Sequence, residues 1–160
     1  AEEAKALVNV TKFRPIGRRN VGGPPIHLAY KPRPPTEVAE LFNSTTLTVA
    51  MVETPGAIAV VDDIAAVEGI DVVMIGGNDL STTMEIPGQT DHPDFVAAFE
   101  ALTAACKKHG KWAGMGGIGN NDHAQKFISM GVQFVLGGSD TALLANGAQQ
   151  RTSELRKLAQ

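Results

Sequence analysis

Glu53 and Asp79 are the residues of this chain whose placement most strongly suggests chemistry. Each follows a short β-branched run that is typical of a strand, TVAMV at residues 48–52 and VVMIGGN at residues 72–78. Asp79 comes 26 positions after Glu53, a separation that fits one strand, one helix and the return. The spacing therefore predicts that two parallel neighbouring strands bring both carboxylates to the same edge of a sheet.

Two carboxylates at one sheet edge can share a metal ion, because adjacent parallel strands lie about 4.8 Å apart and their carboxyl ends point the same way. No histidine or cysteine lies nearby at a ligand spacing, so the oxygen donors favour Mg²⁺ or Mn²⁺ over zinc. The glycine-rich turn at residues 76–78 lets backbone amides approach an anion beside the metal. The structural alternative is that Asp79 caps a turn and Glu53 precedes a helix.

The composition indicates a folded chain that acts on small molecules. The 160 residues are one domain's length, with 43% hydrophobic and 19% charged residues. A net charge of -3 with scattered basic residues gives no reason to expect nucleic acid or an anionic membrane surface. The single cysteine, Cys106, cannot form an internal disulfide, and no apolar run suits a membrane helix. We therefore expect a cytoplasmic protein, and the abrupt helical start suggests missing upstream sequence.

Hydrophobic periodicity predicts the elements that position the two carboxylates. We expect four strands, over residues 47–52, 72–75, 112–115 and 134–136. Helices are expected over about residues 1–10, 36–43, 55–64 and 93–109, then from residue 121 and from residue 140. Residues 14–35 are rich in proline, glycine and basic side chains, which predicts a long irregular loop.

Caps and one apolar stripe support these helices. Thr36 and Thr54 are the expected N-caps of the second and third, and Pro55 suits a first helical position. The helix that Asp91 and Pro93 open carries a regular apolar stripe. Its members are Phe95, Ala98, Phe99, Leu102 and Cys106. Cys106 is therefore expected in the core.

The alternation of strands and helices predicts parallel β/α units, either in an open doubly wound sheet or in a TIM barrel. A conspicuous turn follows every strand, ETPG, GGND, GGIGN and GGSD in chain order. Polar turns at all strand ends favour the barrel, because an open sheet concentrates binding at one switch point. A closed barrel needs eight strands and typically ~250 residues, and this chain supplies about half. Four barrel strands alone would leave two sheet edges exposed.

Several segments resemble the HpcH/HpaI family of class II pyruvate aldolases. They are MVETPGA at 51–57, DIAAVEGID at 63–71 and IGGNDLS at 75–81, with GRRNVG at 17–22, DHP at 91–93 and GSDTALL at 138–144 in the same order. The resemblance covers nearly the whole chain. It implies that residues 1–160 are a single domain segment, the second half of a TIM (β/α)8 barrel with strands 5 to 8 and their helices. Family members carry proline where this chain has Gly77.

The same resemblance implies a function. Glu53 and Asp79 would be the family's metal ligands, for Mg²⁺ or Mn²⁺ with Co²⁺ also possible, and Gly77, Asn78 and Asp79 would bind the carboxylate of a pyruvate-like donor. The expected activity is a metal-dependent aldolase or lyase that cleaves or forms a carbon–carbon bond of a 2-oxo acid, with an aldehyde as partner substrate, through a pyruvate-type enolate. Resembling enzymes are hexamers, which implies a homo-oligomer.

The family's histidine base and its arginine lie on earlier barrel strands, so the catalytic residues are not expected in this chain. His92, His109 and His123 all stand at expected helix ends, where capping or surface duty is the ordinary reading, and Arg19 is expected to be structural or interfacial. Two alternatives stay open. One is a non-catalytic half-barrel fragment or subunit that needs a partner; the other is a phosphosugar-binding barrel enzyme that uses the last two glycine turns.

Overall fold

Four parallel strands form a single sheet in the order β1-β2-β3-β4 in this computed structural model, which describes residues 1–22 and 26–158. The strands are β1 (Val49–Val52), β2 (Val72–Gly76), β3 (Trp112–Gly116) and β4 (Val132–Val135). Met51 lies opposite Met74, and Met74 lies opposite Gly114. The predicted parallel β/α order is confirmed. Strand β4 begins earlier than predicted, because Val132 already pairs with Ala113. The register then shifts between Ala113 and Gly114, and Gly114 pairs with Phe134.

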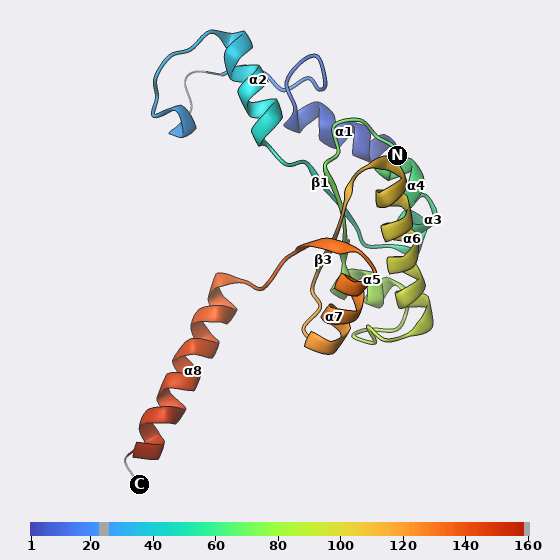
Figure 1. Cartoon of the computed structure of the whole chain (residues 1–160), viewed down its shortest axis with the longest axis vertical. Helices are drawn as coiled ribbons and strands as arrows, with labels where there is room; N and C mark the ends of the chain where they lie inside the picture. Colours follow the sequence, from blue (N-terminus) through green and yellow to red (C-terminus); the bar gives the residue numbers. More distant parts are fainter. Residues whose placement is uncertain (23–25, 159–160) are drawn as a thin grey trace.

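Helices precede, connect and follow the strands (Figure 1). They are α1 (Glu2–Thr11), α2 (Pro35–Thr45), α3 (Pro55–Ala59), α4 (Val61–Ala65), α5 (Gly77–Thr83), α6 (Pro93–His109), α7 (Asn121–Ser129) and α8 (Asp140–Leu158). A short 3-10 helix, η1 (Ile26–Leu28), lies within the predicted irregular loop, of which residues 23–25 are outside the described part.

Local chemistry explains where the helices agree with the predictions and where they differ. The Thr54 side chain accepts a hydrogen bond from the Ala57 amide at 3.1 Å, so this cap is confirmed. The Thr36 cap is wrong, because Pro35 starts α2 one residue earlier and places Thr36 inside its first turn. The helix predicted after β1 is broken at Val60 into α3 and α4. The glycine turn after β2 is itself the first turn of α5.

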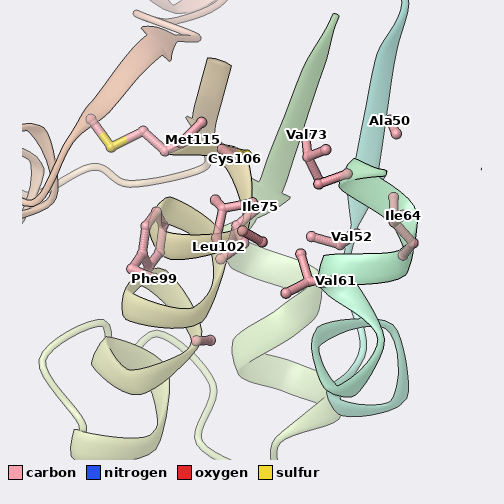
Figure 2. Close-up of a cluster of buried hydrophobic side chains, with 14 of the residues drawn as sticks. Ala50, Val52, Val61, Ile64, Val73, Ile75, Phe99, Leu102, Cys106 and Met115 are labelled. Atoms are coloured by element: carbon pink, nitrogen blue, oxygen red, sulfur yellow. The ribbon is translucent and has the colours of Figure 1, made fainter. Parts of the chain in front are cut away.

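The core lies between the sheet and the helices that cover one of its faces, chiefly α4 and α6 (Figure 2). Alternate strand residues point into it, which is the periodicity of a sheet covered on this side. The labelled members are Ala50, Val52, Val73, Ile75 and Met115 from the strands, with Val61, Ile64, Phe99, Leu102 and Cys106 from the helices. Cys106 is buried as predicted, and burial raises the pKa of its thiol to about 11, which makes it an inert core residue.

The opposite face of the sheet, here called the open face, is exposed only in part, because Val72 and Met74 in its middle are buried. Met51 and Trp112 point to it and are each 49% exposed, although both are large apolar side chains. Strands β1 and β4 are the two edges of the sheet. Helix α8 extends away from the other elements, and no residue of it is buried within the described part (Figure 1).

A buried lysine ties the N-terminal elements to the amino ends of the strands. Lys12 is 3% exposed, and its Nζ donates hydrogen bonds to Asn43 O at 3.2 Å, to Asp71 Oδ2 at 3.0 Å and to Thr46 O. Asp71 Oδ2 also accepts from the Thr48 amide at 2.7 Å, directly before β1. This network joins α1, α2 and the starts of β1 and β2. None of the described helices is long and apolar enough to span a lipid bilayer.

Candidate metal and substrate site

Glu53 and Asp79 lie together at the carboxyl edge of the sheet. Glu53 directly follows β1, and Asp79 is the third residue of α5, which begins where β2 ends. The Glu53 carboxylate lies over Gly76, where a side chain would have stood: a Cβ atom on Gly76 would be 2.4 Å from Glu53 Oε1. Gly76 comes two residues after Met74 in β2 and therefore faces the same side of the sheet, the side of Met51. The Glu53 carboxylate thus lies on the open face, opposite the core. The structure brings the predicted pair together.

The Asp79 carboxylate affects the titration of Glu53. Burial raises the pKa of Glu53 above its ordinary value, and the Asp79 carboxylate raises it further through a side-chain hydrogen bond and charge repulsion. Two anionic groups in contact are a destabilising arrangement unless a proton or a cation lies between them. A divalent cation would relieve this repulsion while using oxygen ligands of both residues.

Thr83 fixes the distance between the two elements that carry these carboxylates. Its Oγ1 donates to the backbone oxygen of Glu53 at 2.8 Å and to Leu80 O at 3.0 Å. The last residue of α5 is thereby joined to the end of β1. The sequence analysis missed this contact, because a threonine 30 positions from its partner carries no local signal.

The residues predicted to bind substrate form the first turn of α5 and are supported by the loop after β3. Gly77 is buried, and a Cβ atom there would be 2.6 Å from Ile118 Cδ1. Gly117 has a φ of +72, and a Cβ on it would be 3.1 Å from the Asn78 amide nitrogen. Close backbone packing at both glycines therefore holds the Asn78 amide beside the carboxylate pair. Ile118 occupies the space that a larger residue at position 77 would need.

The donor set fits a hard divalent ion that takes part of its shell from elsewhere. Glu53 and Asp79 supply carboxylate oxygens, and Mg²⁺ or Mn²⁺ favours such ligands. Across residues 1–22 and 26–158, no group of three or more histidine, cysteine, aspartate or glutamate side chains could hold a metal. The protein part described therefore offers two ligands, which leaves positions for water and a chelating substrate.

The histidines contact residues other than Glu53 and Asp79. His92 accepts from the Asp94 amide at 3.3 Å as the N-cap of α6, in agreement with its predicted capping duty. His109 Nε2 lies 3.1 Å from Asp62 Oδ1 on α4, and His123 Nδ1 lies 2.5 Å from Thr90 Oγ1. The ring of His27 meets the Phe42 ring edge-on. Each of these contacts is structural.

Comparisons with known proteins identify relatives of this chain. The HpcH/HpaI aldolase/citrate lyase family matches residues 1–147. A 4-hydroxy-4-methyl-2-oxoglutarate aldolase of Hapsidospora irregularis is 40% identical over 94% of this chain and 57% of its own length. A 4-hydroxy-2-oxo-heptane-1,7-dioate aldolase of Salmonella typhimurium is 35% identical over 93% of this chain and 56% of its own. This chain thus spans little more than half the length of these relatives.

A solved structure shares the fold. The HpcH/HpaI aldolase from Desulfitobacterium hafniense superposes with a TM-score of 0.83 and 28% sequence identity, over 97% of this chain and 60% of the other. The family match covers most of the chain and includes both carboxylates, the turn between them and the start of α8. The chain belongs to the HpcH/HpaI aldolase/citrate lyase family.

Proposed function

We propose that this chain forms the metal-holding part of an aldolase or lyase that cleaves or forms a carbon–carbon bond of a 2-oxo acid. The observation that carries the proposal is the pair of carboxylates at neighbouring strand ends, with Glu53 over Gly76 and Asp79 near enough to raise the pKa of Glu53. These residues would hold Mg²⁺ or Mn²⁺, and Co²⁺ also suits oxygen ligands. When bound, the ion would supply Lewis-acid stabilisation of a pyruvate-type enolate.

The first turn of α5 would orient the substrate. Gly77 permits close approach, and the backbone amides of Asn78 and Asp79 would donate to the carboxylate of the 2-oxo acid. Both relatives described above are named for 4-hydroxy-2-oxo dicarboxylates. We therefore propose a 4-hydroxy-2-oxo acid as substrate, whose C3–C4 bond breaks to give a 2-oxo acid and an aldehyde or ketone. The aldolase relatives favour this reading over a phosphosugar enzyme.

We also propose that the four strands are the second half of an eight-stranded TIM barrel. Strands β1 and β4 present unpaired edges, and the open face between them carries Met51 and Trp112, as the inside of an incomplete barrel would. The family's histidine base and arginine would come from the other strands. On this proposal residues 1–160 alone are inactive, and the complete protein is a homo-oligomer.

Metal affinity tests the carboxylate pair directly. Titration of Mn²⁺ followed by calorimetry should show at least tenfold weaker binding for Glu53→Ala and for Asp79→Ala, because each removes one of two protein ligands. Asp63→Ala is the matched control, since Asp63 is an exposed carboxylate on α4. Unchanged affinity in both site variants would remove the proposed metal site.

Activity tests the barrel proposal separately. Exchange of the pyruvate methyl protons into D₂O, and cleavage of 4-hydroxy-2-oxo acids, would be measured with Mg²⁺ or Mn²⁺. We expect neither reaction from residues 1–160 alone and both from a protein that also contains the other four strands. Turnover by the 160 residues alone would contradict the half-barrel proposal while leaving the metal site intact.

A further inference from the structure

Three arginines line a groove that is separate from the carboxylate site. The groove has a volume of about 490 Å³ and lies between residues 13–21 and the first turns of α2. We call it the arginine groove, after Arg14, Arg18 and Arg19, which line it together with Glu40. Its volume is in the range of small-molecule sites.

The arginine groove lies at the other end of the sheet from Glu53 and Asp79. It adjoins Phe13, which follows Lys12 in the chain, and Lys12 pairs with Asp71 directly before β2. The two carboxylates instead follow the carboxyl ends of β1 and β2. A molecule in the groove would therefore be a second ligand, distinct from a substrate at the metal site.

The charge of the groove is unbalanced. Within residues 1–22 and 26–158, none of the three arginines has a carboxylate within 4.0 Å, whereas nearby Arg33 is paired with Glu37. Glu40 is the single acidic residue of the lining. A lining with three arginines and one glutamate carries net positive charge and attracts anions, because Arg binds carboxylate and phosphate through paired hydrogen bonds.

The arginines are presented by a backbone that is already ordered. The Arg18 amide donates to Asn9 O at 2.9 Å, and the Arg19 amide donates to Lys12 O at 3.0 Å. Gly17 directly precedes Arg18 and packs closely against the backbone of Lys12, because a Cβ atom on Gly17 would lie 2.2 Å from Lys12 O. The Arg19 guanidinium carbon lies 4.9 Å above the Phe13 ring and 5.7 Å from the Phe42 ring centre. A ligand would find this side of the groove formed in advance, which lowers the entropic cost of binding.

The start of α2 adds a second positive feature. Pro35 and Thr36 line the groove, and no side chain caps this 11-residue helix. Pro35 has no N–H, so the free amides at this end of the helix are those of Thr36 and Glu37, and the positive end of the helix dipole lies at the groove. Phe13, Val21 and Ala39 supply apolar surface beside these charges.

We propose that the arginine groove binds a small organic anion with at least two negative groups, carboxylates or phosphates, at the end of the sheet remote from the metal site. Two probes represent the two sources of charge: inorganic pyrophosphate and the tricarboxylate tricarballylate. Calorimetric titration without metal, at low ionic strength, should give saturable binding of one or both to the full chain. Binding of only one probe identifies whether phosphate or carboxylate is the preferred group.

Variants locate the binding. Arg14→Ala with Arg18→Ala should weaken it at least tenfold, while Arg33→Ala, the matched control with its own partner Glu37, should change it less than twofold. Glu40→Gln should tighten binding severalfold, and a gain of affinity cannot come from unfolding. Saturable binding of neither probe, or equal affinity in the double arginine variant and the control, would overturn the proposal.

Discussion

Glu53 holds its proton more strongly than an ordinary glutamate, because burial and the Asp79 carboxylate both oppose its charge. Without metal, this raised pKa makes the folded state lose stability as pH rises from the unfolded pKa of Glu53 to its folded pKa. With metal, the carboxylate must be ionised to bind. Metal affinity should therefore fall as pH is lowered through the raised pKa of Glu53.

Replacement of Asp79 by asparagine should lower the pKa of Glu53, since the variant loses the neighbouring negative charge. The measurement is the titration of the Glu53 carboxyl carbon by NMR in the metal-free protein. Asp63→Asn, on the surface of α4, serves as the control and should leave the Glu53 titration unchanged. A Glu53 pKa that stays the same or rises in Asp79→Asn would show that the two carboxylates do not interact.

Gly76 is a glycine because Glu53 occupies the space of its side chain. Gly76→Ala would place a Cβ atom 2.4 Å from Glu53 Oε1, so the carboxylate must move away from its place above β2. The far end of a glutamate moves easily, and we expect a loss of folding stability below ~1 kcal/mol. Metal affinity should fall at least tenfold. Calorimetry and thermal melting separate the two effects.

The control for Gly76 is Gly56→Ala, because nothing lies within 4 Å of a Cβ atom at Gly56. It should keep wild-type metal affinity. If Gly76→Ala also keeps it, the space above β2 does not position the carboxylate, and the Thr83 contact to the Glu53 backbone becomes the better explanation of how the site is held.

At the scale of the elements, Lys12 is a side chain that joins several segments. Lys12→Met would remove a buried cation, leave Asn43 O and Thr46 O without this donor, and leave Asp71 without its charged partner. Breaking a buried ion pair by removing one partner typically costs about 3–5 kcal/mol. We expect a loss of this order in denaturant unfolding, lessened because the Asp71 side chain is 30% exposed.

Lys5→Met is the matched control. Lys5 lies on α1, which Lys12 directly follows, and it also pairs with an acid, but the Lys5 and Glu2 side chains are both exposed, at 58% and 87%. Exposed pairs contribute roughly 0–1 kcal/mol. Equal stability losses in the two variants would mean that the Lys12 network is not what joins α1 and α2 to the sheet.

Some of these elements could be predicted from the sequence and others could not. Parallel order, the α6 stripe and the place of both carboxylates follow from period and spacing, and these were predicted. Helix α5 was not, because a start of Gly77 and Asn78 has low helix propensity and is stabilised by packing against the loop after β3. The break at Val60 and the Thr83 contact likewise depend on tertiary geometry that no local pattern encodes.

For the whole molecule, the open face of the sheet is the feature with the largest consequence. Trp112 is the chain's single tryptophan and lies 49% exposed on that face. Apolar side chains between two unpaired strand edges favour association. We expect the isolated 160 residues to self-associate in sedimentation experiments, and the Trp112 emission to shift to shorter wavelength as protein concentration rises.

A charge on the open face should prevent this association. Met51→Lys places an ammonium group among apolar side chains, keeps Trp112 as the reporter and should give a monomer with concentration-independent emission. Val10→Lys is the control, because Val10 is 69% exposed on α1, away from the sheet face, and should associate as the wild type does. A wild-type chain that sediments as a stable monomer would mean that the face tolerates water, and the barrel proposal would lose its physical basis.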